Sequence, residues 1–197
     1  MIIVFCSPKG GVGKSTASVL LAAALARAGH RVVMRDLDPD GTATKSAKRF
    51  DLTMASGDQH DGIEIIDTPP SLVHTSTQAA ITKADLVVNV LTLDPADLEK
   101  LPAAIPTLLA LRAGKPLRTL FNRIPQARTL GAKQLPAVRQ QLADAGLAAF
   151  NATMAYRLAY AYSHAAGWGA LNSEASSEVM AFAIEALQFL VVPAEKI

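Results

Sequence analysis

The sequence predicts an α/β protein of three layers, in which a mostly parallel, twisted sheet is covered by helices on both faces. Short runs rich in β-branched residues alternate with alanine- and leucine-rich stretches of helical length, which is the pattern of strand–helix–strand units. Half of the 197 residues are hydrophobic and 18% are charged, which is enough apolar material to bury both faces of a sheet. The length suits one domain, residues 1–197.

The elements follow one another without an internal repeat, a low-complexity segment or a linker. Strands are expected at Ile2–Cys6, Arg31–Asp36, Ile63–Asp67, Leu86–Leu91 and Leu117–Asn122, because each is a short apolar run. Helices are expected at Ser15–Ala28, closed by Gly29, then at Thr75–Lys83, Pro95–Arg112 and Gly131–Ala145, and within Arg157–Ala165 and Ser176–Val191.

A glycine-rich segment joins the first predicted strand to the first helix and reads Ser7-Pro8-Lys9-Gly10-Gly11-Val12-Gly13-Lys14-Ser15-Thr16. Glycines let backbone N–H groups turn toward an anion, Lys14 supplies a mobile charge, and the Ser15 hydroxyl can ligate Mg²⁺ at the positive end of the helix. Pro8 departs from the first glycine of the pattern G-x-x-x-x-G-K-[ST]. The segment predicts a nucleotide phosphate site whose contacts are Gly10, Gly11, Val12, Gly13, Lys14, Ser15 and Thr16.

Polar residues close three of the predicted strands. Asp36, Asp67 and Asn122 should gather around the loop that holds Lys14, because open α/β sheets bind ligands beyond the carboxyl ends of their strands. Asp36 and Asp38 alternate along an extended chain, so both could face the phosphates and their metal. An acidic turn closed by Gly41 would explain the same residues.

The octet from Lys9 to Thr16 carries a second lysine, Lys9, that a simple monomeric phosphate site does not need. This octet resembles the deviant Walker A box of the ParA/MinD family of P-loop ATPases. The resemblance implies an enzyme that hydrolyses ATP to ADP and phosphate with Mg²⁺. It also implies that Lys14 binds nucleotide within its own subunit, whereas Lys9 reaches the nucleotide of the other subunit in a dimer.

Two further segments resemble the same family. Asp36-Leu37-Asp38-Pro39 is similar to its D-x-D-P switch I box, which implies that Asp38 orients the attacking water and completes a catalytic set with Lys9 and Lys14. Family members commonly carry glutamine where this chain has Asp40. Asp67-Thr68-Pro69-Pro70 is similar to the D-T-P-P switch II segment, which implies that Asp67 holds Mg²⁺ through water, together with Ser15, and that the proline turn senses the γ-phosphate.

The resemblance continues toward the C-terminus. Asn122 and Arg123, within Phe121-Asn122-Arg123-Ile124-Pro125, resemble the family's adenine-proximal pair, and an amide can pair with a base edge while a guanidinium stacks on its face. A turn after a strand explains the pair almost as well. Met154–Ala161 with Gly167 resembles the family's arginine-containing helix and downstream glycine. Between Thr44 and His60 the chain is short for the family, which predicts the loss of a strand or helix there.

Composition excludes several other classes of site. The only cysteine, Cys6, lies in a predicted strand, so an iron–sulfur cluster or a disulfide framework is excluded and a cytoplasmic location is expected. The chain begins directly with a strand and has no apolar stretch long enough for a bilayer, so neither export nor membrane spanning is expected. The four histidines, His30, His60, His74 and His164, and the three tyrosines, Tyr156, Tyr160 and Tyr162, are interpreted as surface, core or interface residues.

The family resemblance implies a spatial organiser. Such ATPases form a homodimer with ATP, bind double-stranded DNA without sequence preference, associate with the nucleoid, and are stimulated by a ParB-like or cargo-adaptor protein. The cargo would be a plasmid, a chromosome or a protein assembly. The net charge of +2 is compatible with a local basic patch. The candidate DNA contacts are Lys115, Arg118, Arg128, Lys133, Arg139 and Arg157.

Two alternatives remain open. A membrane-surface ATPase similar to MinD would need a basic amphipathic tail, whereas Val179–Val192 is typical of a core helix and is followed by Pro193. We therefore expect no membrane partner. A metabolic ATP-dependent ligase could use the same nucleotide fold, and its ATP turnover would depend on a metabolite rather than on dimerisation.

Overall fold

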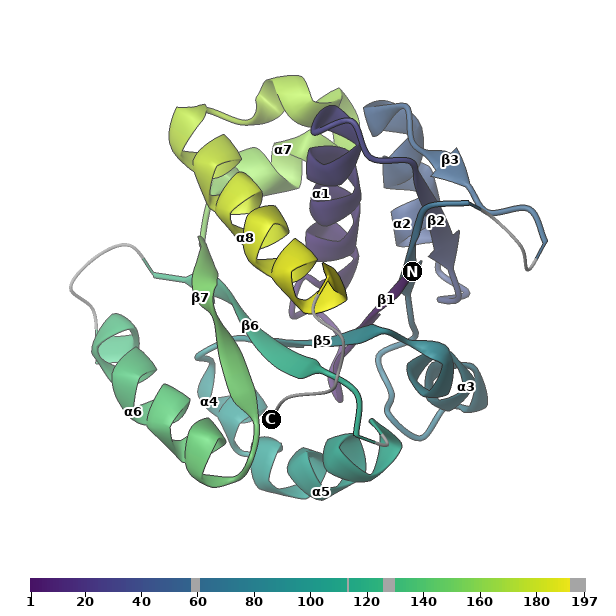
Figure 1. The fold of residues 1–197 in the computed structure, drawn as a ribbon. Helices are drawn as coiled ribbons and strands as arrows, with labels where there is room; N and C mark the ends of the chain where they lie inside the picture. Colours follow the sequence, from purple (N-terminus) through teal and green to yellow (C-terminus); the bar gives the residue numbers. More distant parts are fainter. Residues whose placement is uncertain (58–60, 113, 126–129, 192–197) are drawn as a thin grey trace.

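A single twisted sheet of seven parallel strands forms the centre of the described structure (Figure 1). The computed structural model describes residues 1–57, 61–112, 114–125 and 130–191. The strand order is β3-β2-β4-β1-β5-β6-β7, and every neighbouring pair is parallel. The fold is therefore the predicted three-layer α/β class, and β1 lies in the middle of the sheet between β4 and β5.

The five predicted strands are all present. They are β1 (Ile2–Cys6), β2 (Val32–Asp36), β4 (Ile63–Asp67), β5 (Leu86–Leu91) and β6 (Leu117–Ile124). Every residue of β4 and β5 is buried, as expected for parallel strands covered on both faces. Two edge strands were not predicted, β3 (Thr53–Met54) and β7 (Ala148–Ala155), because one is very short and the other is rich in alanine.

The helices follow the predicted order, except that α2 (Thr42–Ala47) was not predicted and one predicted helix is divided. They are α1 (Lys14–Arg27), α2 (Thr42–Ala47), α3 (Thr75–Lys83), α4 (Pro95–Leu98), α5 (Leu101–Leu111), α6 (Leu130–Asp144), α7 (Leu158–Ala166) and α8 (Ser173–Val191), with 3-10 turns η1 (Lys48–Phe50) and η2 (Gly167–Ala170). The single helix predicted at Pro95–Arg112 is two helices, because Pro102 lacks an N–H and begins a new first turn.

The described part of the interval from Thr44 to His60 holds short elements, and the predicted loss of a family strand or helix there stays a prediction. This part holds most of α2, then η1 and β3, up to the last described residue before position 58. The stretch from Met154 was compared with an arginine-containing helix, but Met154 and Ala155 lie in β7, and Arg157 is the N-cap of α7. Gly167 has φ of 64°, and an added Cβ would lie 2.1 Å from the Arg49 carbonyl oxygen, so this position requires glycine.

Each face of the sheet has its own core. Helices α1, α2, α7 and α8 cover one face, and α3, α4, α5 and α6 cover the other (Figure 1). On the first face Phe182 of α8 packs edge-on against Phe5 and Phe150, with ring centroids 6.2 and 5.1 Å away. These contacts hold α8 against the strand that precedes the glycine loop.

Candidate phosphate-binding site

The glycine loop leaves the centre of the sheet between β1 and α1. Gly11 and Gly13 have φ of 81° and 85°, a backbone conformation that favours glycine. The first turn of α1 carries neither an acidic residue nor a side-chain cap, so its N–H groups are available to an anion. The sequence thus produces the anion cradle that its glycine spacing predicts.

Lys14 and Ser15 meet Asp67 below this cradle. The Lys14 ammonium lies 3.2 Å from one oxygen of Asp67, and the Ser15 hydroxyl donates to the other oxygen at 2.5 Å. Burial raises the pKa of Asp67, and the positive charge of Lys14 partly offsets this effect.

Burial also raises the pKa of the Cys6 thiol to about 12, so this cysteine is a packed thiol rather than a nucleophile.

The same pair of oxygen ligands fits a magnesium site. The Ser15 hydroxyl and the Asp67 carboxylate are hard oxygen donors, the class that Mg²⁺ selects, and Mg²⁺ keeps several waters or phosphate oxygens as its remaining ligands. The residues therefore suit the predicted arrangement of a hydroxyl ligand with a carboxylate acting through water.

All of the predicted site residues except the buried Asp67 and Asn122 line one cavity of about 240 Å³. Its lining includes Lys9, Gly10, Gly11, Val12, Gly13, Lys14, Ser15, Thr16, Asp38 and Arg123, together with Asp40, Thr42 and Pro70. Pro70 brings the turn after β4 to the loop, 3.6 Å from a Cβ added at Gly10. Residues from three strand ends thus surround the space above the cradle.

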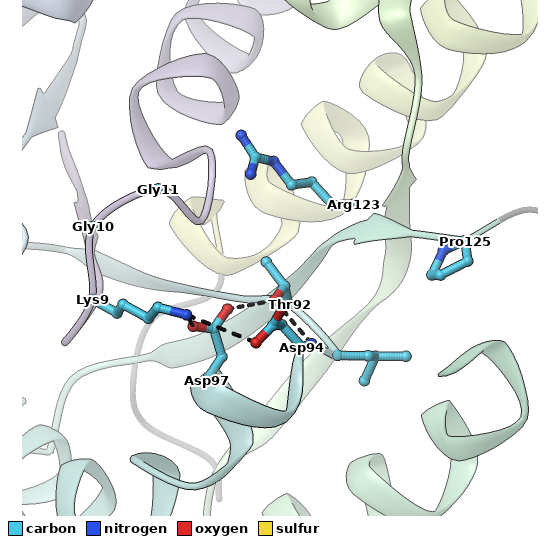
Figure 2. A pocket seen from close by; sticks show the side chains of 9 residues that line it. Lys9, Gly10, Gly11, Thr92, Asp94, Asp97, Arg123 and Pro125 are labelled. Atoms are coloured by element: carbon cyan, nitrogen blue, oxygen red, sulfur yellow. Dashed lines mark hydrogen bonds and ion pairs between the residues drawn. The ribbon is translucent and has the colours of Figure 1, made fainter. Parts of the chain in front are cut away.

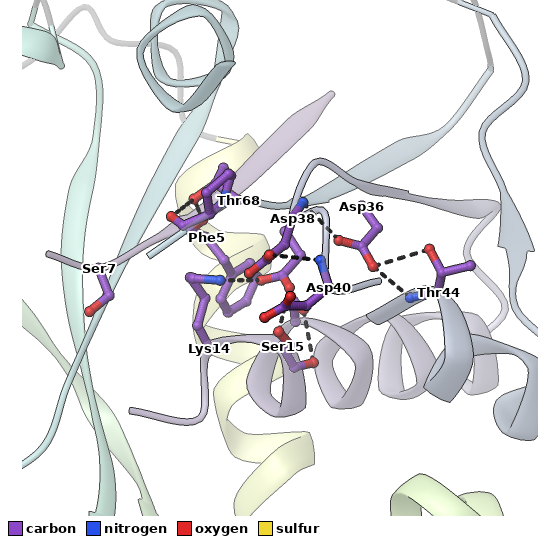
Figure 3. Close-up of polar contacts among 12 residues, drawn as sticks. Phe5, Ser7, Lys14, Ser15, Asp36, Asp38, Asp40, Thr44 and Thr68 are labelled. Carbon is purple, nitrogen blue, oxygen red and sulfur yellow. Dashed lines mark hydrogen bonds and ion pairs between the residues drawn. The ribbon is translucent and has the colours of Figure 1, made fainter. Parts of the chain in front are cut away.

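Asp36 and Asp38 do not share one role, which corrects the expectation that both face the phosphates. The Asp36 carboxylate accepts hydrogen bonds from the Asp38 amide at 3.0 Å and from the Thr44 amide at 2.8 Å (Figure 3). It therefore fixes the turn and the start of α2, as an acidic turn residue does. Asp38 lines the cavity, and its carboxylate accepts from the Asp40 amide at 3.1 Å while its backbone carbonyl accepts from the Gly41 amide at 2.9 Å.

Lys9 points into an acidic recess (Figure 2). Its ammonium lies 2.6 Å from Asp97 and 3.8 Å from Asp94, and Asp97 also accepts a hydrogen bond from the Thr92 hydroxyl. The hydrogen bond to Asp97 raises the pKa of Lys9. This recess was not predicted from the sequence, although Asp94-Pro95 is a recognisable helix N-cap followed by proline.

Asn122 and Arg123 lie beside the glycine loop, and the Asn122 side chain is hydrogen-bonded to that loop. Its amide donates to the Val12 carbonyl at 2.8 Å and accepts from the Arg123 amide at 2.9 Å, and a Cβ added at Gly13 would lie 2.3 Å from it. Arg123 has φ of 55°, an uncommon conformation for a non-glycine residue that is often found at functional sites. Its side chain is exposed and lines the cavity above the loop.

A second cavity of about 310 Å³ lies beside the start of α1. Its lining includes Thr16, Arg123 and His164, together with the exposed side chains of Tyr156 and Leu158. An aromatic and an aliphatic side chain next to a phosphate cradle suit a flat apolar ring. Tyr156 and Tyr160 both line this cavity. Tyr160 is also a core residue, and its hydroxyl donates to Glu178 at 2.6 Å.

Four of the six basic residues predicted to contact DNA have partners within the chain. Arg157 pairs with Glu174 and Glu178 at 2.8 and 2.7 Å, and its hydrogen bond with Glu178 raises the pKa of Arg157. Arg139 donates to the Phe150 and Asn151 carbonyls, Arg118 lies over the Phe189 ring, and Lys115 donates to the Thr82 carbonyl. Lys133 is exposed, and Arg128 lies outside the described residues.

The predicted core character of α8 is confirmed, since Val179, Phe182, Ala183 and Ala186 are buried. Pro193 and the residues after it lie outside the described part of the chain. Within residues 1–57, 61–112, 114–125 and 130–191, none of the helices has the length and apolar character that crossing a membrane requires.

Comparison with known proteins places these residues in a family context. The model of the CobQ/CobB/MinD/ParA nucleotide binding domain matches residues 3–166. Maintenance of carboxysome distribution protein A of Gloeobacter kilaueensis is 32% identical over 166 residues, which cover 77% of this chain and 74% of that protein. The chromosome-partitioning ATPase Soj of Thermus thermophilus is 38% identical over 89 residues, which cover 40% and 36%.

A solved structure shares the fold over nearly the whole chain. The putative plasmid partition protein of Borrelia burgdorferi, bound to AMPPNP, superposes with a TM-score of 0.73, covering 95% of this chain and 98% of that one. The two sequences are 17% identical, so the likeness concerns the fold.

Proposed function

The chain belongs to the CobQ/CobB/MinD/ParA family of nucleotide-binding domains, and from this premise we propose a single-domain, Mg²⁺-dependent ATPase that dimerises on ATP and positions a cargo. The relatives named for carboxysome distribution and chromosome partitioning support positioning as the task. The observation that carries the proposal is the convergence of Lys14, Ser15 and Asp38 at one cavity above the glycine loop. The buried Asp67 carboxylate contacts both Lys14 and Ser15.

Each of these residues has a separate task in hydrolysis. The N–H groups of the loop and the Lys14 ammonium hold the β- and γ-phosphates, and Asp38 orients the attacking water. Ser15 and Asp67 would hold Mg²⁺, which neutralises phosphate charge when bound. Arg123 borders both cavities, which supports a contact with the base or the sugar.

Dimerisation would use the face that carries Lys9. This side chain is partly exposed at the rim of the loop, and its contacts with Asp94 and Asp97 are ion pairs that another anion could replace. In the proposed dimer each Lys9 contacts the nucleotide of the other subunit. Loss of the γ-phosphate would remove that contact and release the subunits.

DNA binding is proposed for the ATP dimer, together with a nucleoid-associated place in the cytoplasm and a ParB-like or cargo-adaptor partner. Most of the basic residues named in the sequence have partners within the chain, so the proposal rests on the partition relatives and on exposed lysines such as Lys133. A MinD-like membrane role is less well supported, because the apolar face of α8 is buried against the sheet.

The test compares the ATP and ADP states of the whole chain. With Asp38→Ala, nucleotide binds but water is no longer oriented, so the ATP dimer should accumulate. This variant with ATP should bind arbitrary duplex DNA, and raising salt from about 50 to 200 mM should weaken binding at least about tenfold, because phosphate contacts release counterions.

Size-exclusion chromatography and DNA mobility shift measure the two properties separately. The matched control is the parent with ADP, which should remain monomeric and unbound. ATP hydrolysis at the parent rate by Asp38→Ala would refute the role of Asp38. A stable ATP dimer that ignores DNA would refute DNA binding alone, and sedimentation of that dimer with anionic liposomes would favour the membrane role.

A further inference from the structure

His164 links the end of the glycine loop to the segment that follows Asp38 through two side-chain hydrogen bonds. It lies on α7, which packs against both α1 and α2 (Figure 1). Its Nε2 lies 2.7 Å from the Thr16 hydroxyl, and its Nδ1 contacts the Ser46 hydroxyl. The two contacts span 148 and 118 residues of sequence, so histidine spacing alone gave no sign of them.

The direction of this hydrogen-bond chain follows from counting protons. The Ser46 hydroxyl donates its single proton to the Thr42 carbonyl at 2.9 Å, so it can only accept from His164. Nδ1 therefore carries the imidazole proton. Burial lowers the pKa of His164, which favours the neutral ring with one N–H. Nε2 then accepts the proton of the Thr16 hydroxyl.

Thr16 and Thr42, the two ends of this series of hydrogen bonds, both lie at the proposed nucleotide site. Thr16 and Thr42 line the cavity above the glycine loop, and Thr16 also lines the neighbouring cavity that His164 borders. Thr42 is the first residue of α2, four residues after Asp38. A change in the hydrogen bonding of Thr16 can therefore be transmitted to the segment that holds Asp38. The Thr16 hydroxyl, the neutral His164 ring and the Ser46 hydroxyl each donate one proton along the way.

We propose that four residues, Thr16, His164, Ser46 and Thr42, form a hydrogen-bond relay, which we call the His164 relay. The relay couples binding of a phosphate in the glycine loop to the conformation of the segment from Asp38 to Thr42, and His164 is its positioning residue. The inference rests on the proposed function, since it needs a nucleotide in the loop. A phosphate oxygen that accepts the Thr16 hydroxyl proton leaves Nε2 without its donor.

The remaining hydrogen bonds of the His164 relay then reverse their direction. His164 takes the Nε2–H form and donates to Thr16, the Ser46 hydroxyl donates to the vacated Nδ1, and the Thr42 carbonyl loses its hydrogen bond from the Ser46 hydroxyl. One proton leaves Nδ1 for water and one reaches Nε2 from water, so the ring remains neutral throughout. The release of Thr42 frees the start of α2 to adjust beside Asp38.

The tautomer of His164 is a signature that a purely structural contact would not change. The chain has four histidines, so imidazole nitrogen NMR of ¹⁵N-histidine-labelled protein can resolve them, and His164→Asn identifies the resonance by its loss. We expect the Nδ1–H form in the free protein and the Nε2–H form with AMPPNP and Mg²⁺. The same tautomer in both states would overturn the relay.

Kinetics provide the second measurement. His164→Phe and Ser46→Ala each break the relay, and turnover should fall about tenfold with KM unchanged, the size of effect that one lost hydrogen bond produces. Exposed His30→Phe is the matched control and should match the parent. Parent turnover in both relay variants would overturn the proposal. If the parent itself fails to bind AMPPNP, the proposed function falls and the relay with it.

Discussion

The two lysines of the glycine loop occupy opposite environments five residues apart. Lys14 is 6% exposed and is enclosed between α1 and the sheet against Asp67, whose side chain is fully buried. Lys9 is 31% exposed and pairs with Asp97 and Asp94 at the rim. A buried pair fixes its geometry because separating it leaves an unpaired charge. Water solvates Lys9 and Asp94, whose side chain is 59% exposed, so that pair exchanges partners at little cost. The Asp97 carboxylate is only 4% exposed, so Lys9 leaves it at a greater cost.

This difference indicates a division of labour within one loop. A lysine held inside the subunit suits binding in the same subunit, and a lysine at the surface suits binding across an interface. The first group should control nucleotide affinity, and the second should control assembly and hydrolysis. Substitutions at the two positions and at their acidic partners can separate these roles.

The largest effect is expected at Lys14. Lys14→Ala and Lys14→Gln should weaken ATP binding on the order of 100-fold, because a charge-assisted contact with phosphate is lost. Fluorescent nucleotide titration measures this, and exposed Lys83→Ala is the matched control. Circular dichroism must show folded protein, since the change also leaves Asp67 unpaired. A folded variant that keeps parent affinity would contradict the assignment.

Lys9→Ala should leave nucleotide affinity within about threefold of the parent and reduce hydrolysis at least about tenfold, because the charge that it supplies acts in the assembled site. Phosphate release and nucleotide titration measure the two quantities. Equal losses of affinity and turnover would instead place Lys9 in the site of its own subunit.

Mixing variants shows where Lys9 acts. Lys9→Ala retains Asp38, and Asp38→Ala retains Lys9, so a mixed dimer holds one complete site if Lys9 crosses the interface. The equimolar mixture should then reach about a quarter of the parent rate, since half of the dimers are mixed and one of their two sites is complete. No gain over the separate variants would refute action across the interface.

The positions of the glycine loop and of Asp67 could be predicted from the sequence because their chemistry is local. Glycine, lysine and serine at fixed spacing between a strand and a helix define an anion site wherever the chain folds that way. Asp67 was predictable for a related reason, because a strand in mid-sheet must end at the same edge as its neighbours.

The missed features depend on distant partners. The residues of β7, Ala148–Ala155, have weak strand propensity, and the strand pairs with β6 while Glu185 and Glu178 on α8 accept hydrogen bonds from its backbone at Asn151, Ala152 and Ala155. Asp97 and His164 likewise find their partners through the tertiary fold. Periodicity and motif spacing carry no information on such contacts.

The smallest effect is expected at Asp97, and it tests whether the rim pair restrains Lys9. Asp97→Asn keeps an oxygen that can accept from Thr92 but removes the charge that holds the ammonium. The free protein then has no ion pair with Asp97 to break before Lys9 turns toward a partner. ATP-dependent dimers should form at about two- to fivefold lower protein concentration, which sedimentation can measure.

The dependence of dimerisation on ionic strength further distinguishes Asp97→Asn from the parent. The advantage of Asp97→Asn should shrink only modestly as ionic strength rises, because salt screens the partly exposed Lys9 ammonium but reaches the buried Asp97 carboxylate poorly. Asp144→Asn, which removes the same charge from the far end of α6, should leave dimerisation unchanged at every salt concentration. Weaker dimerisation of Asp97→Asn would assign the opposite role to Asp97, because the carboxylate would then hold Lys9 ready for the partner subunit rather than away from it.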